Sequence, residues 1–306
     1  MLLRVGYHMT ISVPRPTHLF TLMNLHPERS ADVKWQRATA TSPAVPIRAF
    51  IDQHGNSCQR MVAPAGDFSI SHDAVISDPG TPDLHAPDAV ELRPEHLPDG
   101  CLRYLAGSRY CETDRLWNLA WKLFGATEPG WARVQAICDY VHKRLAFSYG
   151  YARSTRTAVE AHEERVGVCR DFAHLAIAFC RCLNIPARYV NGYLGDIGVE
   201  PDPSPMDFSA WFEVYLGDRW YAFDARHNRP RIGRIVVARG RDAMDVPLLN
   251  TFGPHVLKGF SVWTEEVEPA VLAMPGKIRP QQPTRLGPPG RSPLDLGSRE
   301  GVLRLV

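Results

Sequence analysis

One short segment, residues 165–186, limits the folds open to this chain more than any other. From position 169 onward the apolar residues recur at the spacing of a single helical face, and they are Phe172, Leu175, Ala176, Phe179 and Leu183. The following Asn-Ile-Pro ends this pattern, because proline disfavours a helical conformation in the residue before it. The segment therefore predicts a helix that begins at Cys169 and buries one side in a core.

The cysteine at the start of this helix is a candidate nucleophile. Backbone N–H groups in the first turn of a helix have no intrahelical partner, and the positive end of the helix dipole lies there. Both effects favour the thiolate over the thiol, and the thiolate is the reactive form. We therefore expect a lowered pKa for Cys169 and a base close to it.

A downstream hairpin contains the position at which such a base would be expected. Two strand-like runs, residues 209–216 and 219–224, are joined by a Gly-Asp pair that is typical of a tight turn. If Leu216 pairs with Arg219, position 209 and Asp224 share one face and lie about 7–8 Å apart between backbones. A histidine at 209 would be oriented by Asp224, but the chain has Ser209 there.

His227 is the alternative source of an imidazole. In an extended chain it would face away from Asp224, but Arg229-Pro230 indicates that the strand ends, and a turn at 226–228 would bring it back. Otherwise His227 is a surface histidine at a strand end. His174 follows Cys169 by five residues on the helix and points about 140° away from it, so a packing role is expected.

Strand, helix and proline signals divide the chain into three parts. Residues 1–100 contain short alternating strands interrupted by prolines, which predicts a β-sandwich-like domain. Residues 101–266 have helical patterns followed by strand-like runs, which predicts an α+β core domain. Residues 267–306 are rich in Pro, Gly and Arg, and we expect a disordered tail with a short apolar end.

Composition argues against several classes of function. The 35 basic and 33 acidic side chains give a formal net charge of +2, which provides no electrostatic basis for binding nucleic acid or an anionic membrane. No apolar run approaches a transmembrane span, and the first residues do not resemble a secretion signal. The seven cysteines show no CxxC pair and the histidines no ligand spacing, so we expect reduced thiols, a cytoplasmic location and no metal.

From about Tyr104 to Trp263 the chain resembles the bacterial transglutaminase-like superfamily. The matching stretches are Gly167-Val-Cys-Arg-Asp-Phe-Ala-His-Leu-Ala176, Ile185-Pro-Ala-Arg-Tyr-Val190 with Gly192-Tyr193, Ala-Trp-x-Glu-Val at 210–214, Trp-Tyr-Ala-Phe-Asp at 220–224, and Gly240-Arg-Asp242 with Asp245-Val246. The first hundred residues resemble the β-rich module that often precedes this core in bacteria. The resemblance implies an α+β fold, with an all-β module before a papain-like transglutaminase core whose cysteine-bearing helix packs on an antiparallel sheet.

The resemblance also assigns roles to individual residues. The family's catalytic cysteine corresponds to Cys169 and its aspartate to Asp224. Its histidine, normally the residue before Ala-Trp, corresponds to Ser209, and serine cannot replace imidazole as a general base near neutral pH. The candidate catalytic residues are therefore Cys169, Asp224 and His227.

Two functions from different classes fit this pattern. The first is a cysteine hydrolase that cleaves a peptide or protein amide through a thioester on Cys169, and the resemblance favours hydrolysis over cross-linking. The second is a catalytically inactive peptide-binding or assembly module that has lost its base. A redox-sensing thiol is a third hypothesis, but it needs a resolving cysteine that the spacing does not offer. None of these implies a cofactor.

Overall fold

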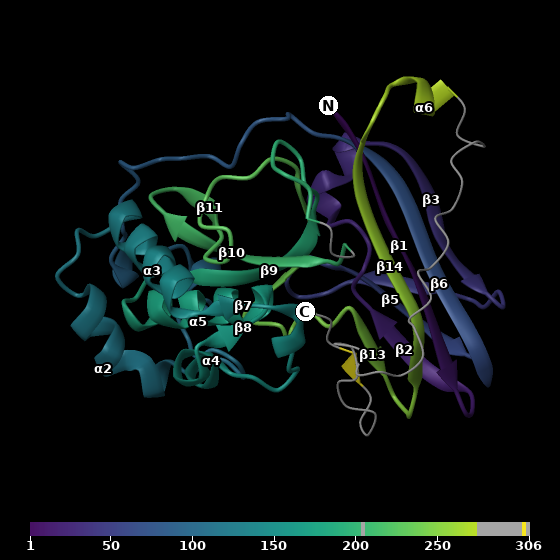
Figure 1. The fold of residues 1–306 in the computed structure, drawn as a ribbon, viewed down its shortest axis with the longest axis horizontal. Coiled ribbons are helices and arrows are strands. Elements are labelled where there is room, and N and C mark those ends of the chain that lie inside the picture. Colours follow the sequence, from purple (N-terminus) through teal and green to yellow (C-terminus); the bar gives the residue numbers. More distant parts are fainter. Residues whose placement is uncertain (203–205, 274–301, 304–306) are drawn as a thin grey trace.

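The structure is a computed structural model that describes residues 1–202, 206–273 and 302–303. A strand-rich part and a part that contains most of the helices lie side by side (Figure 1). The α+β class predicted from the sequence is confirmed. The expectation of disorder for the tail falls mainly on residues 274–301 and 304–306, which lie outside the described residues.

The first sheet of the strand-rich part is built around β1 (Leu2–Val13). Side chains at alternate positions of this strand, from Leu3 to Val13, are buried, as expected for a strand with one face on a core. The antiparallel order is β14-β1-β6-β3, where β14 is Val256–Val267, β6 is Gly66–Ser77 and β3 is Val33–Ser42.

A second sheet completes this part of the molecule. Its order is β15-β13-β2-β5-β4, and the strands are β15 (Val302–Leu303), β13 (Leu249–Thr251), β2 (Thr17–Thr21), β5 (Ser57–Ala63) and β4 (Arg48–Ile51). Buried residues of both sheets belong to one hydrophobic core. Residues 249–267, which the sequence places almost entirely in the core domain, contain β13 and β14. These two strands pair with the N-terminal strands β2 and β1.

Gly6 permits a close approach of a β14 side chain to the middle of this sheet. The indole of Trp263 on β14 and the backbone oxygen of His72 on β6 occupy the space where a Cβ at position 6 would lie. The Trp263 Nε1–H also donates to Asp73 at 3.2 Å, and Asp73 pairs with Arg4 at 2.8 Å. Packing and hydrogen bonds therefore join β1, β6 and β14 across the sheet.

The second part of the molecule surrounds the helix α5 (Cys169–Cys182). All 14 residues of α5 are buried. It packs on a sheet of order β11-β10-β9-β12, formed by β11 (Arg219–Phe223), β10 (Ser209–Leu216), β9 (Ala187–Leu194) and β12 (Arg234–Gly240). The helices α2 (Thr113–Phe124), α3 (Trp131–Arg144) and α4 (Ala158–Glu164) contact it from other sides. The helix predicted to begin at Cys169 is confirmed.

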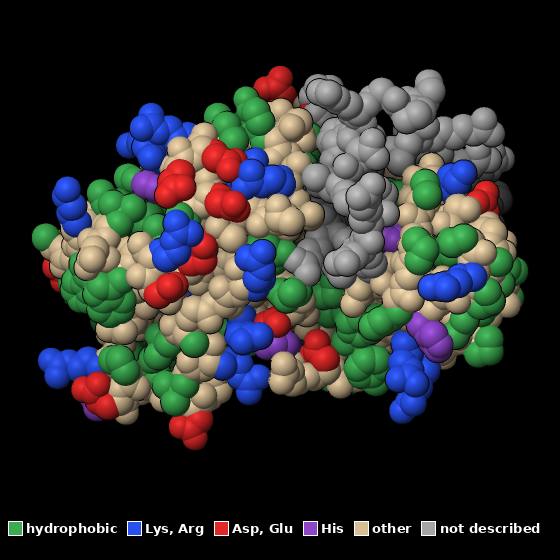
Figure 2. Space-filling view, turned by 90° about the horizontal axis from the view of Figure 1, so that it is seen from below, with side chains coloured by type: hydrophobic (Ala, Val, Ile, Leu, Met, Phe, Trp, Pro, Cys, Tyr) green, Lys and Arg blue, Asp and Glu red, His purple; other side chains and the backbone are tan. Residues whose placement is uncertain are grey.

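Short elements connect these units. They are the helices α1 (Asp99–Leu102) and α6 (Ala270–Ala273), the 3-10 turns η1 (Pro27–Asp32), η2 (Pro94–His96) and η3 (Tyr149–Tyr151), and the parallel pair β7 (Ala146–Phe147) and β8 (Val166–Gly167). Within the described ranges, none of the helices has the length and apolar character needed to cross a membrane. Acidic and basic side chains are interspersed on the face drawn in Figure 2.

Candidate active site

Cys169 is the first residue of α5, and an ionic cluster holds the start of that helix. The Asp171 carboxylate accepts a hydrogen bond from the Val168 N–H at 3.0 Å, and Arg156 donates to the same oxygen at 3.0 Å. The Asp171 side chain is fully buried, so this arrangement fixes the loop-to-helix transition from inside the protein. Asp171 therefore has a structural role, and the helix start that presents the thiol is rigidly supported.

The Cys169 sulfur lies against the first residues of β10. The Ala210 N–H donates to Sγ at 3.3 Å, and the residue is 2% exposed. Burial raises the pKa of the thiol to about 11, although the Arg226 guanidinium and the Ala210 N–H both act to lower it. The lowered pKa predicted from the helix dipole is therefore wrong for this structure, because desolvation of the thiolate outweighs the favourable dipoles.

The predicted register of the hairpin is confirmed. Leu216 pairs with Arg219 and Phe212 with Phe223. Asp224 therefore directly follows β11 and lies beside the start of β10. Ser209 is the first residue of β10 and is 6% exposed. Its Oγ has no hydrogen-bond partner among the residues that the structure describes. The position corresponding to the family's histidine is thus an enclosed site next to the thiol.

Asp224 is buried and bound from several directions. Its Oδ1 accepts from the backbone N–H groups of Arg226 at 3.0 Å and His227 at 3.1 Å. Its Oδ2 lies 2.9 Å from His227 Nδ1 and 3.0 Å from the Arg234 guanidinium. Burial alone would raise the pKa of Asp224, but Arg234 and His227 hold it well below its usual range. The carboxylate is therefore ionised and able to orient an imidazole.

A turn after β11 brings His227 back to Asp224, as the Arg229-Pro230 signal predicts. The Asn228 N–H donates to the Asp224 carbonyl at 2.7 Å, and Asn228 has a left-handed backbone with φ of 49°. Because Asp224 is ionised, Nδ1 of His227 is the donor in their contact, which leaves Nε2 as the proton acceptor. No residue in the described ranges bonds to that nitrogen, and the side chain is 18% exposed.

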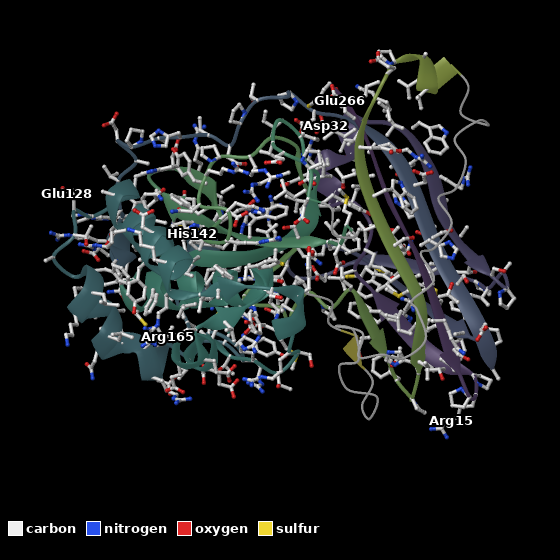
Figure 3. All side chains as sticks on the ribbon, in the orientation of Figure 1. Arg15, Asp32, Glu128, His142, Arg165 and Glu266 are labelled. Carbon is white, nitrogen blue, oxygen red and sulfur yellow. The ribbon has the colours of Figure 1, made fainter. Side chains whose placement is uncertain are left out.

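Helix α3 anchors this turn. His142, labelled in Figure 3, has its Nδ1 at 3.1 Å from the Ala225 carbonyl and 2.9 Å from the Arg226 carbonyl, so its Nδ1–H donates to both. The Asn228 side chain donates to Asp139 at 2.8 Å and accepts from Gln135 at 2.9 Å. Three side chains of one helix therefore fix the backbone that presents His227.

A cavity of about 170 Å³ lies beside these groups. Ser209 and His227 both line it, together with Tyr149, Leu194, Asp196, Asp202, Met206, Asp207, Phe208, Arg226 and Arg231. Among these residues, Arg226 lowers and Asp207 raises the pKa of the Cys169 thiol, and Cys169 in turn raises the pKa of Tyr149. Ser209 lines this cavity and directly precedes Ala210, whose N–H donates to the Cys169 sulfur, so the thiol lies close to the cavity that the Asp224-oriented imidazole lines.

Comparison with known proteins assigns the chain to a family. A family model described as "Transglutaminase-like superfamily" matches residues 118–225. A solved structure from Cytophaga hutchinsonii, named "Putative Cysteine Protease", is 30% identical, with a TM-score of 0.76 over 88% of this chain and 91% of that one. The chain belongs to the transglutaminase-like superfamily. The predicted core, with its cysteine-bearing helix on an antiparallel sheet, is confirmed.

Proteins of mycobacteria are similar to part of this chain in sequence. An uncharacterised protein of Mycobacterium leprae is 30% identical over 117 residues, which is 37% of this chain and 41% of that protein. An uncharacterised protein of Mycobacterium tuberculosis is 39% identical over 97 residues, or 28% of this chain and 30% of that protein. The matched region thus spans well under half the length of these superfamily relatives.

Several residues that support or line the candidate site of this superfamily member have little or no local signal in the sequence. His142 is 83 residues from the carbonyl that it binds, and Arg234 belongs to a run of arginines that resembles an ordinary solvated face. Asp207 has a weak signal, since it stands two residues before Ser209. His174 has the packing role expected from helical spacing: it is fully buried, its Nε2 accepts from the Ala243 N–H at 3.1 Å, and its ring stacks on Tyr110.

The donor groups near the site do not form a metal cluster. Across residues 1–202, 206–273 and 302–303, no three or more His, Cys, Asp or Glu side chains converge in a way that would hold a metal ion.

Proposed function

We propose that this protein is a cysteine hydrolase that cleaves a peptide or amide bond through a thioester on Cys169. The observation that carries the proposal is the 2.9 Å contact of His227 with the ionised Asp224, at a cavity lined by Ser209, the neighbour of the residue whose N–H binds the Cys169 sulfur. Nucleophile, base and orienting carboxylate are the three parts that thiol hydrolysis requires. Membership of the superfamily and the name of the Cytophaga hutchinsonii relative, a putative cysteine protease, support the same reaction class.

His227 is the general base in this mechanism. Nε2 accepts the thiol proton, the sulfur attacks the substrate carbonyl, and the resulting imidazolium is stabilised by Asp224. Because burial raises the pKa of Cys169, proton removal accompanies the attack rather than preceding it. The backbone N–H of Cys169, at the start of α5, is the natural donor to the oxyanion. Water then hydrolyses the thioester.

A comparison of four variants tests this assignment. The assay measures release of p-nitroaniline from a panel of dipeptide p-nitroanilides by the full-length chain. C169A is expected to abolish turnover, and H227A to lower kcat by about 10²–10⁴-fold. D224N is expected to lower kcat because the imidazole loses its orientation. H18A, in the exposed part of β2, is the control and keeps wild-type turnover. Full turnover by H227A would refute the role of His227.

A catalytically inactive peptide-binding module is the second candidate, and two observations favour it: serine at position 209 and the raised pKa of the Cys169 thiol. The substitution S209H separates the two functions. If His227 already serves as base, S209H changes turnover little. If the protein is inactive, S209H restores a base beside the thiol and creates p-nitroanilide hydrolysis where the wild type has none.

The remaining assignments belong to the same proposal. A peptide or protein amide is the substrate, no cofactor takes part, and the reaction takes place in the cytoplasm. The seven cysteines, all free and buried, are compatible with that compartment.

A further inference from the structure

We propose that Asp207 is a second catalytic residue, which protonates the leaving amine and later accepts a proton from the attacking water. This inference rests on the proposed hydrolase function and divides its proton transfers between two groups. His227 exchanges a proton with the Cys169 sulfur, and Asp207 exchanges a proton with the substrate nitrogen and with water.

The position of Asp207 is the first support. It stands two residues before Ser209, on the approach to β10, and it lines the same cavity as Ser209 and His227. Its Oδ1 accepts the Phe208 N–H at 2.7 Å, which fixes the carboxyl group. Within the described ranges, Oδ2 accepts no hydrogen bond. One oxygen is therefore held by the backbone, and the other is available to a substrate.

Proximity to the thiol is the second support. Asp207 stands three residues before Ala210, whose N–H donates to the Cys169 sulfur at 3.3 Å. Asp207 reaches the cavity from the start of β10, whereas His227 reaches it from the end of β11. The segments next to the neighbouring strands β10 and β11 therefore bring two different proton-transfer groups to one cavity.

The protonation state of Asp207 suits both roles. Burial raises the pKa of this carboxyl group to about 7, so its acid and its conjugate base are both populated near neutral pH. Asp224 cannot share the task, because four hydrogen bonds hold it in the ionised form. The other charged groups at the cavity are Asp196, Asp202, Arg226 and Arg231.

Those other groups are engaged elsewhere or have the wrong charge for an acid. Asp196 accepts the Asp202 N–H at 2.9 Å and lies 3.6 Å from Arg231. Asp202 itself is exposed to solvent. The Arg226 guanidinium lies 3.7 Å from the centroid of the Phe147 ring, and a guanidinium does not release its proton in this pH range. Asp207 is thus the carboxyl group best placed to act as an acid.

The proton balance closes over one cycle. In acylation the thiol proton passes to His227, the sulfur–carbon bond forms, the carbon–nitrogen bond breaks, and the amine leaves with the proton of Asp207. In deacylation the Asp207 carboxylate takes a proton from water, the oxygen attacks the thioester, and the departing sulfur recovers its proton from His227. The products are a carboxylic acid and an amine, and both residues return to their starting states.

The dependence of the reaction on the leaving group tests this division. One dipeptide is prepared as an alkylamide, whose nitrogen must be protonated to leave, and as a p-nitrophenyl ester, whose phenolate leaves without a proton. For D207N, kcat on the alkylamide is expected to fall by about 10²–10⁴-fold, whereas the pre-steady-state burst of p-nitrophenolate stays within about threefold of the wild type. Steady-state ester turnover slows, and the thioester accumulates in intact-mass spectra.

Each alternative outcome has a distinct meaning. If D207N lowers the burst and amide turnover equally, Asp207 is structural and the inference is wrong; unchanged amide turnover also overturns it. If the wild type turns over neither substrate, or if C169A keeps its activity, the hydrolase proposal fails and the role of Asp207 fails with it. D218N, in the exposed hairpin turn, is the matched control and keeps both wild-type rates.

Discussion

At the scale of single residues, two opposing effects act on the Cys169 sulfur. The start of a helix favours a thiolate, and the nearby Arg226 guanidinium adds to that effect. Burial of the side chain, which is 2% exposed, removes water from the thiolate, and this cost is larger. The balance of these effects favours the neutral thiol.

Substitution of Arg226 tests this balance. The rate of Cys169 alkylation by iodoacetamide, followed by peptide mass spectrometry between pH 7 and 10, reports the thiolate fraction. R226Q removes a positive charge that lowers the pKa of the thiol, so alkylation at a given pH becomes slower than in the wild type. R226K keeps the charge and stays close to the wild type, as does R219Q on the exposed edge of the hairpin. Faster alkylation of R226Q would contradict this account.

Local patterns in the sequence locate Cys169, Asp224 and His227, but they do not indicate the protonation state of the thiol. The nucleophile is recognisable because a helical pattern begins at its position. Its pKa depends on burial and on the charges of Arg226, Asp207 and Asp224, which come from segments far along the chain from Cys169. Desolvation is a property of the assembled cavity, so the spacing of residues within one segment cannot predict it.

At the scale of elements, the turn between β11 and β12 determines where His227 lies. The hairpin register follows from its Gly-Asp turn, and the return of the chain after Asp224 follows from the proline that ends the strand. The bonds from α3 that hold the turn connect residues 83 to 93 positions apart. No local pattern encodes contacts of that range, so the sequence predicts the turn but not its support.

The support of the turn by His142 can be tested directly. H142L removes the donor to the carbonyls of residues 225 and 226, and we expect about a tenfold loss of kcat with little change in KM. H142Q keeps an amide donor and is expected to recover most of the activity. The NMR resonance of the His227 ring should broaden in H142L alone. Equal losses in H142L and H142Q, without broadening, would assign His142 to general stability.

At the scale of the whole molecule, buried neutral histidines make stability depend on pH. His72 is 5% exposed on β6, and burial lowers its pKa to about 4, compared with about 6.5 in the unfolded chain. Between these values the unfolded state binds more protons than the folded state. The free energy of unfolding therefore falls as the pH decreases from about 6.5 toward about 4.

Urea denaturation at pH 7 and pH 5 measures this effect. The contribution of His72 to the loss of unfolding free energy between the two pH values is about 2 kcal/mol. H72Q cannot be protonated and is expected to show a smaller loss, while H18A, whose side chain is exposed, keeps the wild-type dependence. An identical pH dependence in H72Q and the wild type would show that His72 is already charged at pH 5.

The pairing of β1 with β14 has a consequence for biosynthesis. The part of the molecule around α5 is made after β1 and before β14, so translation must reach about residue 267 before the outer edge of that sheet is covered. A premature stop codon between positions 251 and 256 would leave the backbone amides along one edge of β1 unpaired. It would also remove the Trp263 indole that packs on Gly6. Such a shortened product would aggregate or be degraded, even though Cys169, Asp224 and His227 had all been translated.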